Sequence, residues 1–186
     1  QSNFQRYQGK INFQQKIGKN VTVDLLANYS RSITNGVTPT DAQAASSATG
    51  WLMYSVWGYR PVKPIRSGNS DDLYDDLVDS EVTGASDYRF NPVKTAQNEY
   101  RKTIVDYLNA NLGLTWEIVD DLKLKITGGY TMNNRRREEF NGTQTYTGYP
   151  GSPSGKGVTG GIYWNRKLTW LNENTLTWSP TFAQKH

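Results

Sequence analysis

The chain has 186 residues, of which 35% are hydrophobic and 12% aromatic, and its mixed acidic and basic residues give a formal net charge of +4. The absence of cysteine excludes a disulfide scaffold and thiol chemistry, and the interspersed charges exclude the basic footprint of a nucleic-acid-binding protein. A mean hydropathy of -0.73 leaves little to bury in a compact soluble domain. Polar alternation with many aromatics is instead typical of a barrel with lipid outside and water inside.

Two strands are predicted first, over residues 3–17 and 21–33. Apolar side chains occupy alternate positions in both, as in strands with one buried face. The shared apolar face is predicted to carry Tyr7, Gly9, Ile11, Phe13 and Ile17 from the first strand and Val21, Val23, Leu25, Ala27 and Tyr29 from the second. The residues between them, 18–20, have the composition of a tight turn.

Regular alternation stops over residues 35–97, so a long loop with a short helix is predicted there. Loops of this length are usually functional or disordered. The stretch "DAQAASSATGWLMYSVWGYRPVKP" predicts a helix with Asp41 as its N-cap and stop signals at Gly58 and Pro61. Further along, Asn91-Pro92 is interpreted as a turn.

Three more strands are predicted at about 100–118, 122–146 and 162–178, with a second long loop at 147–160. The residues predicted to face lipid are Leu112, Leu114, Trp116, Leu122, Leu124, Ile126 and Tyr130. The apolar face of the last strand is less clearly defined, because Asn172 and Asn174 occupy the same alternate positions as Trp170 and Leu176.

Short and long connections between the predicted strands alternate along the chain. Short turns fall near 19, 120 and 181, and long loops at 35–97 and 147–160, so all short connections fall at one end of a meander. This is the layout of an outer-membrane barrel with short periplasmic turns and long extracellular loops. The apolar run 122–132 also has the length of a tilted strand that crosses lipid. The alternative is a soluble carbohydrate-binding β-sandwich that uses exposed Trp and Tyr side chains as a sugar platform.

Several phrases resemble the barrel of SusC/RagA-type TonB-dependent transporters, which occur in the outer membrane of Bacteroidetes and similar bacteria. They are "QRYQGKINFQQKIGKNVTVDLLANYS", "WLMYSVWGYRPVKP" followed later by Asn91-Pro92, "LGLTWEIVDDLKLKITGGY" and "NENTLTWSPTFAQKH". They occur in the family's order over most of the chain.

The resemblance implies a plugged barrel of about 22 strands, roughly five of which lie in this sequence. It implies uptake of an oligosaccharide or peptide, driven by TonB, together with a SusD-like surface lipoprotein. The family's plug, TonB box and N-terminal extension lie outside this sequence, so we expect a segment of a larger subunit. A structural SusC-like subunit of an outer-membrane assembly is a further alternative.

Three groups of residues are candidate sites. The aromatics Trp51, Tyr54, Trp57 and Tyr59 suit contact with a ligand or partner, or packing within their own loop. The acidic residues Asp71, Asp72, Asp75 and Asp76 suit Ca²⁺, although a solvated loop is the simpler interpretation because EF-hand spacing is absent.

The third group is Arg135, Arg136 and Arg137, which suit lipopolysaccharide phosphates; the simpler alternative is pairing with Glu138 and Glu139. The only histidine is His186, and no nucleophile, phosphate loop or metal-ligand cluster is evident. We therefore expect no enzymatic activity and no cofactor.

Overall fold

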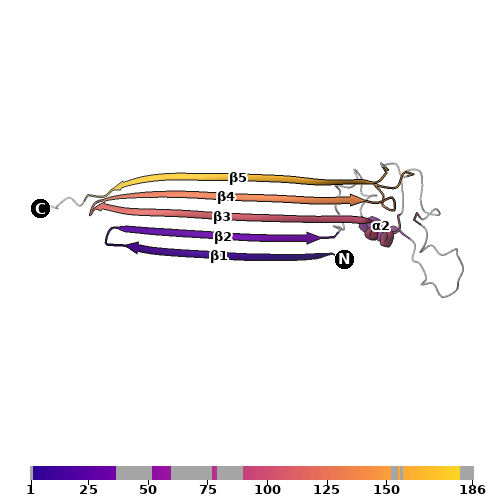
Figure 1. The fold of residues 1–186 in the computed structure, drawn as a ribbon, viewed down its shortest axis with the longest axis horizontal. Coiled ribbons are helices and arrows are strands. Elements are labelled where there is room, and N and C mark those ends of the chain that lie inside the picture. Colours follow the sequence, from indigo (N-terminus) through magenta and orange to yellow (C-terminus); the bar gives the residue numbers. More distant parts are fainter. Residues whose placement is uncertain are drawn as a thin grey trace. The chain divides into compact units, whose positions relative to one another are not determined.

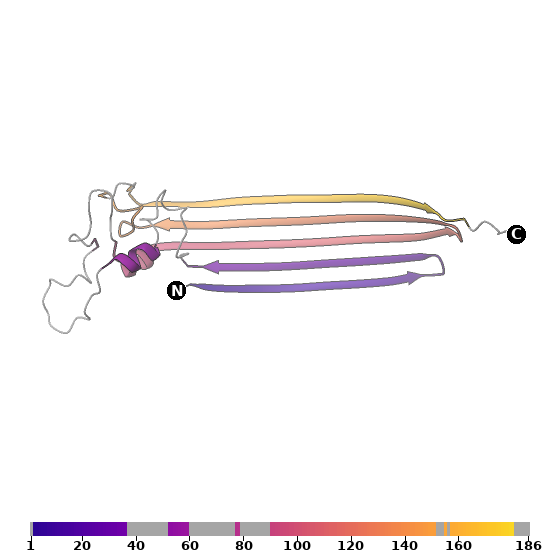
Figure 2. The ribbon, with the colours of Figure 1, turned by 180° about the vertical axis from the view of Figure 1, so that it is seen from behind.

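A computed structural model describes residues 2–36, 52–59, 77–78, 90–151, 155 and 157–180. These residues form five strands, β1 (Asn3–Ile17), β2 (Val21–Asn35), β3 (Glu99–Val119), β4 (Leu122–Asn141) and β5 (Thr159–Trp178), and two short helices, α1 (Leu52–Gly58) and α2 (Pro92–Asn98). The strands form one sheet in the order β1-β2-β3-β4-β5 (Figures 1 and 2). The predicted five-stranded antiparallel meander is thereby confirmed.

No helix among the described residues has the length and apolar character needed to cross a lipid bilayer. The chain divides into two compact units. Unit 1 comprises Gln1–Asn3, Thr34–Thr103 and Arg137–Tyr163, and unit 2 comprises Phe4–Ile33, Ile104–Arg136 and Trp164–His186. Unit 2 therefore contains both short turns between consecutive strands, and unit 1 contains both long connections.

The register of the sheet in unit 2 is fixed by backbone bonds at the short turns. The Glu117 N–H donates to the Asn20 carbonyl at 2.7 Å, and the Ser179 N–H donates to the Asp121 carbonyl at 2.8 Å. Between β3 and β4, the Asn109 side-chain amide donates to the Thr131 hydroxyl at 2.9 Å. Side chains alternate between the faces of a strand. In this register, odd-numbered residues of β1 and β2 therefore share a face with even-numbered residues of β3, β4 and β5.

That shared surface, the apolar face, carries most of the large hydrophobic side chains of unit 2. On the four strands β2–β5 it includes Val21, Val23, Leu25, Tyr29, Leu108, Leu112, Leu114, Trp116, Ile118, Leu122, Leu124, Ile126, Tyr130, Met132, Leu168, Trp170, Leu176 and Trp178. The opposite surface, the polar face, carries mainly amides, hydroxyls and charges, such as Asn28, Asn109 and Lys125. Asn172 and Asn174 share the apolar face with Trp170, and the Asn174 amide donates to Asn172 Oδ1 at 2.8 Å.

The apolar face forms a band of limited height. On β3 it runs from Leu108 to Ile118. At about 3.3 Å per residue this is about 33 Å along the strand, which the strand tilt of about 40° found in transmembrane barrels would reduce to a height of roughly 25 Å. The next row of the same face is polar, with Arg31, Asp106, Asn134 and Arg166 on adjacent strands.

No part of the described chain buries this band. Leu112 is 52% exposed and Trp116 is 44% exposed. The hydrophobic residues that are buried among those described, Tyr59, Phe90 and Tyr146, all belong to unit 1. The described residues contain one sheet, so they do not supply the second layer that a β-sandwich needs.

In unit 1, α2 begins where the sequence suggests only a turn. Asn91 is its N-cap, because Asn91 Oδ1 accepts hydrogen bonds from the N–H groups of Val93 at 3.0 Å and Lys94 at 3.2 Å. Pro92 is the first helical residue, where its missing N–H costs nothing. The helix leads directly into β3 at Glu99, so the turn interpretation of Asn91-Pro92 is corrected to a helix start.

A small core lies next to this helix start. The Phe90 ring meets Tyr146 and Tyr149 edge-on, at centroid distances of 5.6 and 5.7 Å, and Leu77 and Val78 pack against it. Aromatic pairs favour this geometry. The cluster joins segments from both long connections of unit 1.

Other boundaries also differ from the sequence prediction. The strand predicted over 122–146 ends at Asn141, because a turn follows in which the Thr145 N–H donates to the Gly142 carbonyl at 3.2 Å. In that turn the Thr145 hydroxyl donates to the Gly142 carbonyl at 2.8 Å. β2 runs to Asn35 and β5 begins at Thr159. The predicted helix start at Asp41 lies outside the described residues.

Candidate functional site

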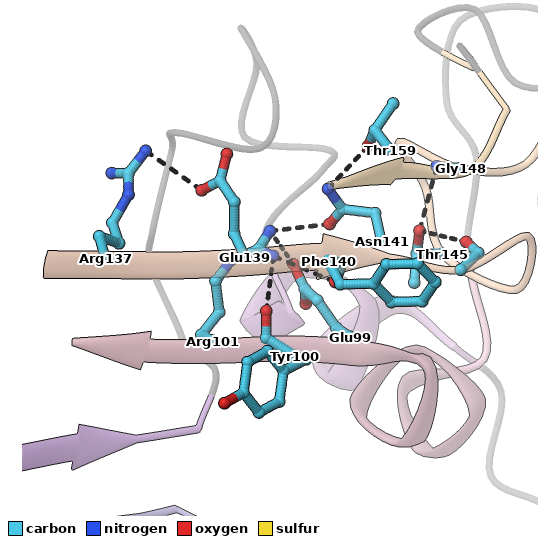
Figure 3. Close-up of polar contacts among 11 residues, drawn as sticks. Glu99, Tyr100, Arg101, Arg137, Glu139, Phe140, Asn141, Thr145, Gly148 and Thr159 are labelled. Atoms are coloured by element: carbon cyan, nitrogen blue, oxygen red, sulfur yellow. Dashed lines mark hydrogen bonds and ion pairs between the residues drawn. The ribbon is translucent and has the colours of Figure 1, made fainter. Parts of the chain in front are cut away.

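A charged cluster lies on the polar face of unit 1, where β3 and β4 approach the long connections (Figure 3). The Arg101 guanidinium lies 2.5 Å from the Glu99 carboxylate and donates to Asn141 Oδ1 at 2.8 Å. The side chains of Arg101 and Glu99 are only 12% and 8% exposed. Arg101 also donates to the carbonyls of Tyr100 at 3.1 Å and Phe140 at 3.3 Å. One guanidinium therefore joins the ends of two neighbouring strands.

A second ion pair extends the cluster along β4. Arg137 Nη2 lies 3.1 Å from Glu139 Oε2, and the Arg137 guanidinium lies 4.7 Å from the centre of the Tyr163 ring on β5. The hydrogen bond between Tyr163 and Glu139 raises the pKa of the tyrosine above its usual value, because phenolate would face a carboxylate. Closer to the end of β4, the Asn141 amide donates to the Thr159 hydroxyl at 3.0 Å (Figure 3).

The turn that follows β4 and the end of α2, next to the cluster in the chain, have hydrogen bonds of their own. The Thr145 hydroxyl accepts from the Gly148 N–H at 3.0 Å (Figure 3). The Asn98 amide at the end of α2 donates to the Lys94 carbonyl and to Gln144 Oε1, both at 2.9 Å. Capping bonds of this kind satisfy backbone groups that a helix end leaves open.

A groove of about 770 Å³ lies beside Arg101 in unit 1. Its polar lining includes Asn3, Asn35, Gln97, Glu99, Tyr100 and Arg101, and Leu52 of α1 borders it. The Asn35 amide donates to Asn3 Oδ1 at 2.7 Å within this lining. Amides, a charged pair and an aromatic ring together offer donors, acceptors and a stacking surface, which are the groups that orient polar ligands in clefts.

The described residues contain no group of three or more His, Asp or Glu side chains that would hold a metal ion. The acidic candidates Asp71, Asp72, Asp75 and Asp76 lie outside the described residues, as does Trp51. Of the other loop aromatics, Trp57 on α1 is 80% exposed, whereas Tyr59 is buried. Tyr54 and Tyr59 both have interaction partners.

The three candidate arginines separate between the two faces. Arg136 lies on the apolar face, whereas Arg135 and Arg137 lie on the polar face, and Arg137 pairs with Glu139. The predicted lipid-facing residues Leu112, Leu114, Trp116, Leu122, Leu124, Ile126 and Tyr130 all lie on the apolar face, because they share the even numbering that the register assigns to it.

Sequence reasoning missed Glu99 and Arg101 as a site. A signal was present, since Glu99 and Arg101, like Arg137 and Glu139, are opposite charges two residues apart. In a strand this spacing places both side chains on one face. What the sequence lacked was the register that brings the two pairs onto neighbouring strands.

No family model matches the chain. The chain aligns with "TonB-dependent receptor P3" of Formosa agariphila at 26% identity over 182 residues, or 98% of the chain. The chain is therefore similar to a TonB-dependent receptor. It spans 17% of the length of that relative, so the similarity concerns one segment of a much longer protein.

Proposed function

We propose that this chain forms adjacent strands in the wall of a TonB-dependent importer in a bacterial outer membrane. The observation that carries the proposal is the separation of the two faces of the sheet in unit 2. An uncovered apolar band roughly 25 Å tall lies on one face, and amides, hydroxyls and charges lie on the other, as in a barrel wall between lipid and water. Similarity to a TonB-dependent receptor supports the same class.

In this function the apolar face anchors the sheet in lipid and the polar face borders the barrel interior. The outer strands β1 and β5 pair with further strands, because an unpaired strand edge in hydrocarbon leaves backbone groups without partners. The short turns then face the periplasm and the long connections face outward. The buried Arg101–Glu99 pair fixes the strand ends from which those connections start.

We further propose the SusC/RagA type of importer, acting on an oligosaccharide or peptide with a SusD-like lipoprotein and with TonB bound through other regions. The phrases quoted from the sequence support the type. The groove beside Arg101 supports a polar ligand, because its lining combines amides with a charged pair and Tyr100. We expect the chain to act without a cofactor and without enzymatic activity.

Site-directed spin labelling tests the proposal, because the chain contains no cysteine to remove. Single cysteines are placed at Leu112 on β3 and at Leu124 and Ile126 on β4, all on the apolar face. Lys123 and Lys125, on the polar face of β4, are the matched controls. The polypeptide is labelled as its host produces it, in native outer membranes. We expect molecular oxygen, which concentrates in lipid, to relax the first set more strongly than a water-soluble nickel chelate does. The same ranking at both sets would refute a lipid-facing wall.

A further inference from the structure

The most informative feature outside the charged cluster is a group of cations on the polar face of unit 2, in the half farther from the short turns. Arg6 and Lys10 lie on β1, Arg135 on β4 and Lys167 on β5. We call these four residues the basic wall. All four side chains are exposed, so they are accessible from the polar side of the sheet.

The pairing of β4 with β5 places two of these cations next to each other. The bond from Ser179 to Asp121 sets a register in which Asn165 lies opposite Arg135. Lys167 is two residues further along β5 and is therefore a diagonal neighbour of Arg135 on the same face. Diagonal neighbours are within reach of long side chains, so the two positive charges repel each other unless an anion lies between them.

No carboxylate lies on the polar face at the level of the basic wall. The register places residues 28–32 of β2 and 105–109 of β3 between the cations of β1 and those of β4 and β5. The polar-face residues of these two segments are Asn28, Ser30, Ser32, Val105, Tyr107 and Asn109. Asp24 is four residues from Asn28, the residue opposite Lys10, which is roughly 13 Å along the strand.

The four cations also have no hydrogen bond or ion pair with other residues that the structure describes. Elsewhere on this face, cations are paired where a carboxylate is near, since Lys123 lies 2.8 Å from Glu117 and Arg137 lies 3.1 Å from Glu139. The basic wall therefore leaves four positive charges for an anion from outside the described part of the chain.

The neutral groups beside the cations indicate which kind of anion fits. The Gln8 amide donates to Asn28 Oδ1 at 3.2 Å, and the Asn109 amide donates to the Thr131 hydroxyl at 2.9 Å. Amides oriented in this way, together with the Tyr107 ring, are the groups that orient polar ligands in binding sites. Sugar hydroxyls can use both the donors and the acceptors. An extended peptide is instead recognised by pairing with a strand edge, whereas the basic wall is the face of a sheet.

From this arrangement we infer that the basic wall binds acidic oligosaccharides, whose sugar rings carry carboxylate or sulfate groups. The inference rests on the proposed function and narrows its substrate class, since it requires the polar face to border the barrel interior. Three strand spacings, or roughly 14 Å, separate the cations of β1 from Arg135 on β4. An oligosaccharide must therefore carry several acidic groups to contact both sides of the wall.

The test compares double variants of equal charge change. One wall variant carries Arg135→Gln with Lys167→Gln, and a second carries Arg6→Gln with Lys10→Gln. The control carries Lys16→Gln with Lys125→Gln, on the polar face in the half nearer the short turns. Each protein is purified in detergent from the outer membranes of its host and checked for folding by heat-dependent gel migration.

Calorimetric titrations then use defined probes of similar length. Hexagalacturonate carries carboxylates, a sulfated galactan hexasaccharide carries sulfates, and maltohexaose is neutral. Monomeric galacturonate tests the need for several acidic groups, and a hexaglutamate peptide tests whether sugar rings are needed at all.

We expect the unmodified protein to bind at least one acidic hexasaccharide at least about tenfold more tightly than maltohexaose, because a charge-assisted contact is worth about a tenfold change in affinity. Each wall variant should lose about tenfold or more for that acidic probe and nothing for maltohexaose. The control should bind like the unmodified protein. The galacturonate monomer should bind far more weakly than the hexamer, and added salt should weaken only the acidic probes.

Four results would overturn the inference. They are equal affinities for acidic and neutral hexasaccharides, no binding of either acidic hexasaccharide at millimolar concentration, an equal loss in the control, and tighter binding of hexaglutamate than of both acidic saccharides. Acidic side chains from another part of the protein could also neutralise the wall. In that case the wall variants should unfold at lower temperature with unchanged affinity for the acidic probes, and this result would overturn the inference as well.

Two further measurements keep the outcome decisive. If a double variant fails to fold, the single variants Arg135→Gln and Lys167→Gln are titrated separately, and each should show a smaller loss that Arg135→Lys or Lys167→Arg avoids. Spin labels at Leu112 and Ile126 separate the two proposals. Lipid-exposed labels without a preference for acidic probes refute the basic wall alone, whereas labels without lipid exposure refute the barrel wall itself.

Discussion

Arg101 on β3 and Asn141 on β4 are joined by a hydrogen bond of 2.8 Å from Nη2 to Oδ1, and the same guanidinium forms an ion pair with Glu99. Both charged side chains are nearly buried. Removing one partner of such a pair leaves a charge in a poorly solvated position, which costs far more than an exposed pair contributes. The strand ends of unit 1 therefore depend on this one arginine.

Replacing Arg101 with Met should loosen the ends of β3 and β4 specifically. Loss of the Arg101 charge beside the nearly buried Glu99 carboxylate should lower the local stability by about 3 kcal/mol. Hydrogen exchange should accelerate at residues 99–101 and 139–141 and stay unchanged in the segments 104–118 and 122–134. Arg135→Met, on the same face of β4, is the matched control. Protection at 99–101 equal to that of the unmodified protein would show that the pair is dispensable.

Replacing Asn91 with Ala should fray α2. The substitution removes the oxygen that accepts from Val93 and Lys94, and lost N-caps typically cost about 1 kcal/mol. Exchange of the Val93 and Lys94 amides is the measurement. Asn91→Asp retains a capping oxygen and should keep their protection. Equal protection in the Ala and Asp variants would contradict the capping role.

Substitution by Val should change the stability of the protein very differently at the two adjacent glycines of β4, Gly128 and Gly129. A Cβ at Gly129 would lie 3.0 Å from Asn111 Oδ1 and 3.3 Å from Leu171 Cβ, whereas a Cβ at Gly128 has nothing within 4 Å. Gly128 borders an apolar hollow lined by Leu25, Ala110, Leu112 and Tyr130.

Gly129→Val should therefore destabilise the protein by about 1–3 kcal/mol through overpacking, while Gly128→Val should stay within about 0.5 kcal/mol of the unmodified protein. Urea unfolding in lipid vesicles measures both variants. A larger loss for Gly128→Val than for Gly129→Val would mean that the two faces are assigned the wrong way round.

A charge in the middle of the apolar face should be costly only if lipid covers that face. Leu112 lies near the centre of the band, where Leu112→Arg should cost about 2–4 kcal/mol in a bilayer. Thr127→Arg, at nearly the same depth on the polar face, is the control and should cost much less. Unfolding titrations in vesicles compare the two variants. A small penalty at Leu112 would argue for water or protein, rather than hydrocarbon, against that face.

The sequence predicted the five strands and the apolar face well, because both depend on a local period of two. Leu112, Leu114 and Trp116 of β3 share a face simply because side chains alternate along a strand. It failed where structure depends on neighbours. The sequence did not predict that Arg101 contacts Asn141, because that contact depends on the pairing of β3 with β4. The end of β4 at Asn141, by contrast, has a local signal, since Asn141-Gly142 is typical of a turn and the Thr145 N–H bonds back to the Gly142 carbonyl.

The site was harder to predict than the fold for the same reason. Asn91-Pro92 carries the residue types of an N-cap and first helical position, but the same pair is also typical of turns. The run Arg135–Arg137 looks like one basic patch in the sequence, but alternation divides it between two surfaces. Lys167 lies beside Arg135 only through the pairing of β4 with β5, which a single sequence does not state.

The outermost strands of the sheet also have a practical consequence. Among the described residues, β1 and β5 each have a neighbouring strand on one side only, so each presents a row of N–H and C=O groups that can pair with any extended chain. Produced alone in water, these 186 residues should stack edge to edge into insoluble fibrous aggregates. Detergent-refolded material will therefore need partner strands for both of these edges before its behaviour tests the proposed barrel wall.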